Sequence, residues 1–230
     1  MTEYTHGGGG RDEDAAQFLD DPLVSEALGA LLDEFARETD RGAILVAADI
    51  VSSHLALTIS ELAPFSAKRT KSLLGYPGLL ASFSARLDMA YMAGFISKNV
   101  YDSADALRKL RNAAAHSQRA FKLADHRPRL WEIADLGPNI PATVNRFAAE
   151  ALLKSYVDSL MASGPELEAQ IGKNPFSTPA EAIALLRERP EFIDQLQDRL
   201  PRHELALAVW LLLGLMSHKR KRHPASKEQG

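Results

Sequence analysis

The sequence predicts an all-α protein: a compact helical domain of about five long helices, with additional short helices near the C-terminus. Beyond residue 20, apolar residues recur at helical spacing along nearly the whole chain. No segment shows the strict alternation of apolar and polar residues that is typical of a strand. Proline and capping residues flank several of the apolar segments, which supports the same fold class.

The first two predicted helices cover residues 22–38 and 43–63. The first begins with Asp21 followed by Pro22, an N-cap residue followed by proline at the first helical position. The second is apolar on most faces, so we expect it to be a central helix. Pro64 ends it, because proline cannot continue a helix.

Further helices are predicted over 77–97, 99–117 and 141–163, with a polar, proline-containing passage over 117–141 between the last two. The apolar stripe of the helix at 77–97 consists of Leu79, Phe83, Leu87, Ala90 and Gly94.

A shorter helix is predicted over 179–189. Thr178 and Glu181 have the spacing of a capping box, and Pro179 lies at the first helical position. Pro190 should end this helix, and two more short helices should follow it.

These segments suggest a division of the chain into four parts. They are an acidic, glycine-rich disordered arm (1–20), a helical domain (21–140), a C-terminal helical extension (141–217) and a basic tail (218–230).

Composition excludes some classes of site. The chain has no cysteine, so disulfides and thiolate zinc sites are excluded. A net charge of −3 gives no general attraction to nucleic acid, so such a partner would need a local basic patch. No signal peptide is evident, and the apolar run at 205–216 falls short of the ~20 residues that span a bilayer. We expect a cytoplasmic protein without metal or cofactor.

Arg111 is the residue whose position most needs an explanation. With about 100° per residue, Arg111 points into the apolar arc of the helix at 99–117, and His116 lies about 140° further round. A guanidinium is costly to bury alone. It must therefore reach solvent, pair with a carboxylate such as Asp49 or Asp88, or face a cleft or a second subunit. His116 would cap the helix C-terminus, where the helix dipole favours its charge.

Other polar residues have both structural and functional interpretations. Arg86 is expected to form an ion-pair network with Asp88 and Asp49, and Arg108 is a further binding candidate. His54 is expected to be a satisfied core or interface histidine. The basic run at 219–222 would either contact phosphates or be a solvated tail.

A family resemblance rests on residues 78–117, GLLASFSARLDMAYMAGFISKNVYDSADALRKLRNAAAHS, with ILVAADIVSSHLALTISEL before it. This segment resembles the mannitol operon repressor family of bacteria over roughly residues 25–120. The resemblance implies a compact all-α domain, a role in transcriptional repression, and no recognised helix-turn-helix. The part from about residue 140 onward falls outside it.

The motif Arg-Asn-x3-His also resembles the wider HEPN superfamily, whose active members are metal-independent ribonucleases that work as dimers. That resemblance implies that Arg111 stabilises charge on a phosphate, Asn112 orients a group and His116 is the acid or base. Three alanines separate Asn112 from His116, where relatives usually carry an acidic or aromatic residue.

Two functions follow from these resemblances. The preferred one is a homodimeric regulatory protein that acts on transcription through a protein partner or weak DNA contacts. The alternative is a ribonuclease or toxin that uses Arg111, Asn112 and His116 on RNA. Neither hypothesis involves a membrane.

Overall fold

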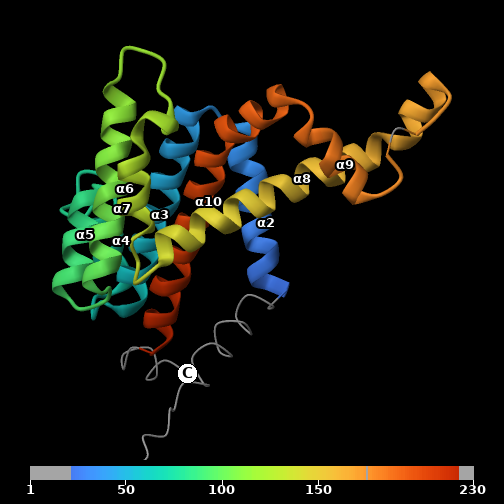
Figure 1. Cartoon of the computed structure of the whole chain (residues 1–230). Helices are drawn as coiled ribbons and strands as arrows, with labels where there is room; N and C mark the ends of the chain where they lie inside the picture. Colours follow the sequence, from blue (N-terminus) through green and yellow to red (C-terminus); the bar gives the residue numbers. More distant parts are fainter. Residues whose placement is uncertain (1–21, 175, 223–230) are drawn as a thin grey trace, which may run out of the picture.

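The computed structural model describes residues 22–174 and 176–222. The described residues form helices and no strands, which confirms the predicted all-α class (Figure 1). The α-helices are α2 (Pro22–Arg37), α3 (Asp40–Leu62), α4 (Ala67–Leu74), α5 (Phe83–Met92), α6 (Lys98–His116), α7 (Arg127–Ala134), α8 (Ile140–Ile171), α9 (Pro179–Arg187) and α10 (Pro190–Arg222). A 3₁₀ turn, η1 (Leu123–His126), precedes α7. The acidic arm expected over 1–20 lies outside the described residues.

Several helix boundaries differ from the sequence prediction. The helix predicted over 77–97 begins only at Phe83, because Ser82 caps it and a tight loop precedes it. The short helices α4 and α7 were not predicted, and α8 extends to Ile171 through an internal proline. The prediction of two short helices after Pro190 is wrong. One helix, α10, continues through Pro201 to Arg222 and takes up the first residues of the predicted basic tail.

Helix α3 is the central element. It starts at the N-cap Thr39, whose Oγ1 accepts a hydrogen bond from Gly42 N at 3.0 Å. Its buried positions pack against α5, α6 and α10. Of the described helices, only α3 is long and apolar enough to match a membrane span, and half of its most apolar window is buried by other helices. A core helix has the same properties, so this match is weak evidence for a membrane.

The main core combines residues from both sides of the division predicted at residue 141. Leu205, Val209 and Leu212 of α10 are completely buried in the same cluster as Leu55 of α3 and Leu107 of α6. Each such leucine contributes about 1.5–3 kcal/mol through removal of its side chain from water. The C-terminal part of α10 is therefore part of the core of the first domain rather than an extension of it.

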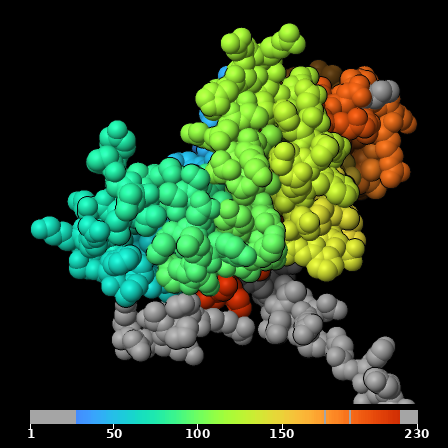
Figure 2. Space-filling model, turned by 90° about the vertical axis from the view of Figure 1, so that its left-hand side faces the viewer, coloured from blue at the N-terminus to red at the C-terminus, as the bar shows by residue number. Residues whose placement is uncertain are grey.

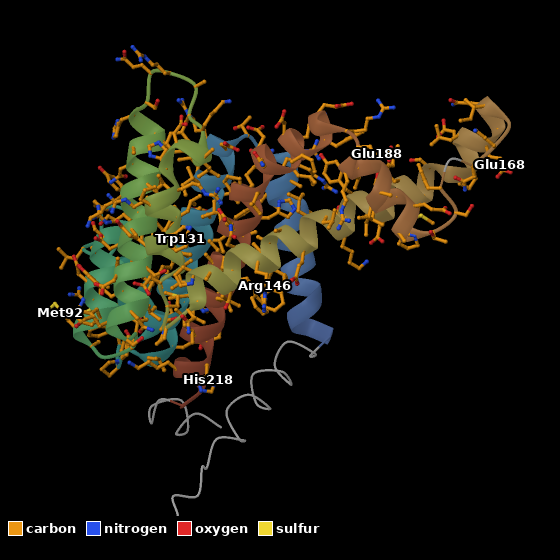
Figure 3. The ribbon with its side chains drawn as sticks, in the orientation of Figure 1. Met92, Trp131, Arg146, Glu168, Glu188 and His218 are labelled. Atoms are coloured by element: carbon orange, nitrogen blue, oxygen red, sulfur yellow. The ribbon has the colours of Figure 1, made fainter. Side chains whose placement is uncertain are left out.

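A second, smaller cluster lies where α8 leaves the main body and α9 packs beside it (Figure 1). Val157 of α8 meets Ala182 and Leu186 of α9 there, together with Phe176. The capping box predicted at Thr178 and Glu181 is confirmed, with both of its hydrogen bonds formed. In Figure 3, Glu168 and Glu188 mark this part of the chain, far from Met92 at the opposite edge of the molecule.

Charged side chains join segments that are far apart in the sequence. Asp40 pairs with Arg202 at 3.2 Å and accepts the backbone N–H of Leu123 at 2.8 Å. Arg41 donates to the carbonyl oxygens of Ser117 and Arg119, each at 2.8 Å, and so holds the loop that follows α6. These contacts fix the end of α6 against the start of α3.

The interior also contains two polar links to α10. Buried Glu204 accepts hydrogen bonds from Arg127 of α7 and Asn145 of α8. His54 of α3 lies 3.1 Å from the hydroxyl of Ser217, so this histidine has a structural partner, as expected. These links hold α3, α7 and α8 to α10.

Candidate functional site

A groove of about 720 Å³ lies between α3, the start of α5 and the second half of α6. It brings together five polar residues singled out in the sequence: Asp49, Arg86, Arg108, Arg111 and Asn112. The other lining residues are Leu45, Ala48, Ser52, Ala81, Ser82, Phe83 and Ser84. Helices α5 and α6 belong to the side of the molecule that faces the viewer in Figure 2.

Arg86 is half-buried and is held by backbone carbonyl groups. Its Nε donates to Leu80 O at 2.8 Å, its Nη2 donates to Leu74 O at 3.1 Å, and its Nη1 donates to the Ser52 hydroxyl at 3.0 Å. A longer contact at 3.4 Å joins Nη1 to Ser52 O. These bonds tie the loop before α5 to α3. Four of the five N–H donors of the guanidinium are used in these contacts.

The prediction that Arg86 forms an ion-pair network with Asp49 and Asp88 is wrong. Among the described residues, neither Asp49 nor Asp88 forms a salt bridge with Arg86. Asp49 is exposed at the groove, and Asp88 lies outside the groove lining and accepts a hydrogen bond from the Tyr101 hydroxyl at 2.9 Å. Carbonyl groups replace these carboxylates because the loop before α5 folds over the guanidinium.

Arg111 is exposed, in contrast to the inward direction that the helical projection gives. Ser103 and Ala106 are also buried on α6, and they place the centre of its buried face roughly 60° away from Arg111. The side chain lines the groove instead, and its Nη1 donates to Asn112 Oδ1 at 3.2 Å. The sequence analysis expected this guanidinium to reach solvent, to pair with a carboxylate, or to face a cleft or a second subunit. In the structure it reaches solvent and also faces a cleft.

Arg108 lines the groove and forms an ion pair with Asp105 on the same helix. Its Nε and Nη2 both contact Asp105 Oδ1, at 2.9 and 2.7 Å, and Lys109 lies 2.8 Å from the other carboxylate oxygen. Burial acts to raise the pKa of Asp105, but the hydrogen bonds from Lys109 and Arg108 outweigh it and lower that pKa. Asp105 therefore remains ionised, and its single charge is shared between Arg108 and Lys109.

His116 does not join the groove. It lies exposed in the last turn of α6 and is absent from the groove lining. The nearby carbonyl groups of Ser117 and Arg119 are bonded by Arg41. Within one chain, Arg111 and Asn112 thus face the groove without His116, as the angle of about 140° between Arg111 and His116 predicts.

Three serines complete the groove, and the sequence analysis did not single them out. Ser82 is the N-cap of α5, and its hydroxyl accepts from Ala85 N at 3.2 Å and lies 3.2 Å from the hydroxyl of Ser84. Ser52 lies on α3 beneath Arg86. Serine is a favoured N-cap residue, so Ser82 directly before Phe83 could have indicated that α5 begins here rather than at residue 77.

The residues that the structure describes contain no group of three His, Cys, Asp or Glu side chains placed to hold a metal ion. Comparison with protein-family models, curated proteins and solved structures gives no match to this chain. The groove itself contains the groups that would contact a ligand. It offers fixed cations, an amide and hydroxyl groups, which are the groups that bind anions.

Proposed function

We propose that the protein is a cytoplasmic regulator of gene expression that resembles a repressor and acts by binding. In this proposal it is a homodimer that acts through a protein partner or through weak DNA contacts. The resemblance of residues 78–117 to the mannitol operon repressor family supports the role in transcription. The groove supports binding rather than catalysis as the mode of action.

One observation carries this preference: the cations of the groove are separated from the histidine of the motif. Arg111 and Asn112 line the groove, whereas His116 lies outside its lining. The described lining residues include no histidine, the side chain that most often transfers protons near neutral pH. A site with fixed cations and hydroxyl groups but no such proton carrier favours recognition of a ligand over cleavage of a bond.

The test is a deletion of the gene followed by measurement of all transcripts. Loss of a repressor should raise the transcripts of a small set of genes, and wild-type protein supplied in trans should restore them. Arg111→Gln should restore them poorly, and Arg119→Gln, which removes an exposed cation outside the groove, should restore them fully. Unchanged transcripts after deletion, with no transcription protein associated with the purified chain, would exclude this function.

A metal-independent ribonuclease is the second candidate function, and the exposure of its motif favours it. Arg111 and His116 are exposed on the last two turns of α6, and Asn112 is half-buried between them. A symmetric dimer that packs along this end of α6 would bring Arg111 of one copy near His116 of the other.

Purified protein incubated with mixed RNA tests this second function. A ribonuclease of this type would give fragments that end in a 2′,3′-cyclic phosphate, and His116→Ala would abolish them. Intact RNA, or cleavage that His116→Ala leaves unchanged, would exclude it. Sedimentation analysis of the same sample measures whether the chain is a dimer.

A further inference from the structure

We propose that the groove binds the phosphate group of a small phosphate monoester. This inference deepens the proposed function, because it gives a class of effector to a site that binds rather than reacts. Its basis is the charge, the free donors and the size of the groove.

The groove holds two guanidinium groups that are not paired with a carboxylate of the described residues. Among the described residues, neither Arg86 nor Arg111 forms a salt bridge, since Arg86 contacts neutral groups and Arg111 contacts the amide of Asn112. Arg108 shares the carboxylate of Asp105 with Lys109, and Asp49 is the single carboxylate in the lining. A phosphate monoester carries about −1.5 to −2 charges at neutral pH, which matches two guanidinium groups.

The donors that remain free also suit phosphate. Arg111 uses one of its five N–H groups within the chain, so the planar edge that pairs with two phosphate oxygens stays available. Arg86 retains one N–H and is fixed in place by its carbonyl partners. Ser82 and Ser84 add hydroxyl groups at the start of α5, where the backbone N–H groups of the first turn favour an anion.

The surroundings favour a small ligand over a polymer. A volume of about 720 Å³ is typical of sites for small molecules. On the other side of α6, a second groove is lined by Asp102, Asp105 and Glu132 together with Lys98, Lys109 and Arg129, so positive charge does not continue there. A nucleic acid needs an extended row of cations along its backbone, and these carboxylates interrupt such a row.

The experiment is a calorimetric titration of the full chain at low ionic strength in a buffer without phosphate. The probes are inorganic phosphate, glycerol 3-phosphate, acetate and a short RNA without terminal phosphates. We expect glycerol 3-phosphate and inorganic phosphate to compete for one site per chain, and acetate and the RNA to bind much more weakly. Backbone amide resonances of residues 82–84 should shift in NMR spectra during the same titration.

Three variants locate the site. Arg111→Gln should weaken binding of glycerol 3-phosphate by at least about tenfold, since a hydrogen bond to a charged group is lost. Arg119→Gln removes the same charge from an exposed position outside the groove and should leave binding unchanged. Asp49→Asn should tighten binding by about two- to fivefold, because it removes the one opposing charge.

Several results would overturn this proposal: no binding of either phosphate probe, equal binding of acetate, preferred binding of the RNA, or equal losses in Arg111→Gln and Arg119→Gln. Retained binding in a protein whose deletion changes no transcript would instead remove the regulatory function and leave the phosphate site standing. The two proposals therefore fail separately.

Discussion

Replacement of Arg86 tests whether carbonyl groups or carboxylates hold the wall of the groove. The side chain donates three bonds between 2.8 and 3.1 Å, to Leu80 O, Ser52 Oγ and Leu74 O. Each is worth about 1 kcal/mol, the value typical of a neutral hydrogen bond, because water still reaches the half-buried guanidinium. In Arg86→Met the apolar side chain still packs against its neighbours, and this packing offsets part of the stability lost with the three hydrogen bonds. We expect the free energy of unfolding to fall by about 2–3 kcal/mol.

Urea unfolding followed by circular dichroism measures this change, and three companion variants identify its cause. Arg86→Lys keeps the charge but cannot reach all three acceptors, so it should lose about 1–2 kcal/mol. Asp49→Asn and Asp88→Asn should each change stability by less than about 0.5 kcal/mol, because neither carboxylate pairs with Arg86. The carbonyl arrangement would be refuted if Asp49→Asn or Asp88→Asn lowered the free energy of unfolding as much as Arg86→Met does. It would also be refuted if Arg86→Met left the free energy of unfolding unchanged.

Three further predictions concern the loop, a buried histidine and a helix cap. Gly78→Ala should destabilise the chain by at least about 1 kcal/mol in the same assay, because a Cβ there would lie 2.3 Å from two carbonyl oxygens at the end of α4; equal stability would show that the loop moves freely. Burial lowers the pKa of His203 below 6.5, so the unfolded chain binds protons more readily and stability should fall as the pH drops through 6.5. His203→Gln should remove that part of the pH dependence, and an unchanged profile would contradict it. Thr178→Ala should cost about 1 kcal/mol through loss of the capping box, against no change for Ser177→Ala.

Helices α2, α3, α6 and the first part of α8, together with the shorter α9, were predictable because each has apolar spacing and clear end signals. The capping box at Thr178 is the clearest case, since two side chains three residues apart define the start of α9. The short helices α4 and α7 were not predictable in the same way. Residues 67–74 are mostly polar and 127–134 lie in a passage with prolines, so their helical state depends on tertiary contacts. Helix α10 was not predicted as one long helix, although it continues through Pro201 to Arg222.

The candidate site was predictable in some of its residues but not in its geometry. The sequence indicated Arg86, Arg108, Arg111 and Asn112, and the structure places all four around one groove. It could not give the direction of Arg111, because helix α7, which packs against α6, was itself not predicted. The partners of Arg86 were equally inaccessible, since backbone carbonyl groups leave no signature in the residue types.

Contacts between α10 and the start of the chain have a consequence for the order of folding. Arg202 bonds to the carbonyl oxygen of Glu38, 164 residues earlier, and Asp40 pairs with the same arginine. During synthesis, α2 and α3 therefore emerge long before the helix that covers their apolar faces is made. Contacts between residues so far apart in the sequence slow folding. Until α10 is made, the apolar faces of α2 and α3 stay exposed, and exposed apolar surface of this kind is what chaperones bind.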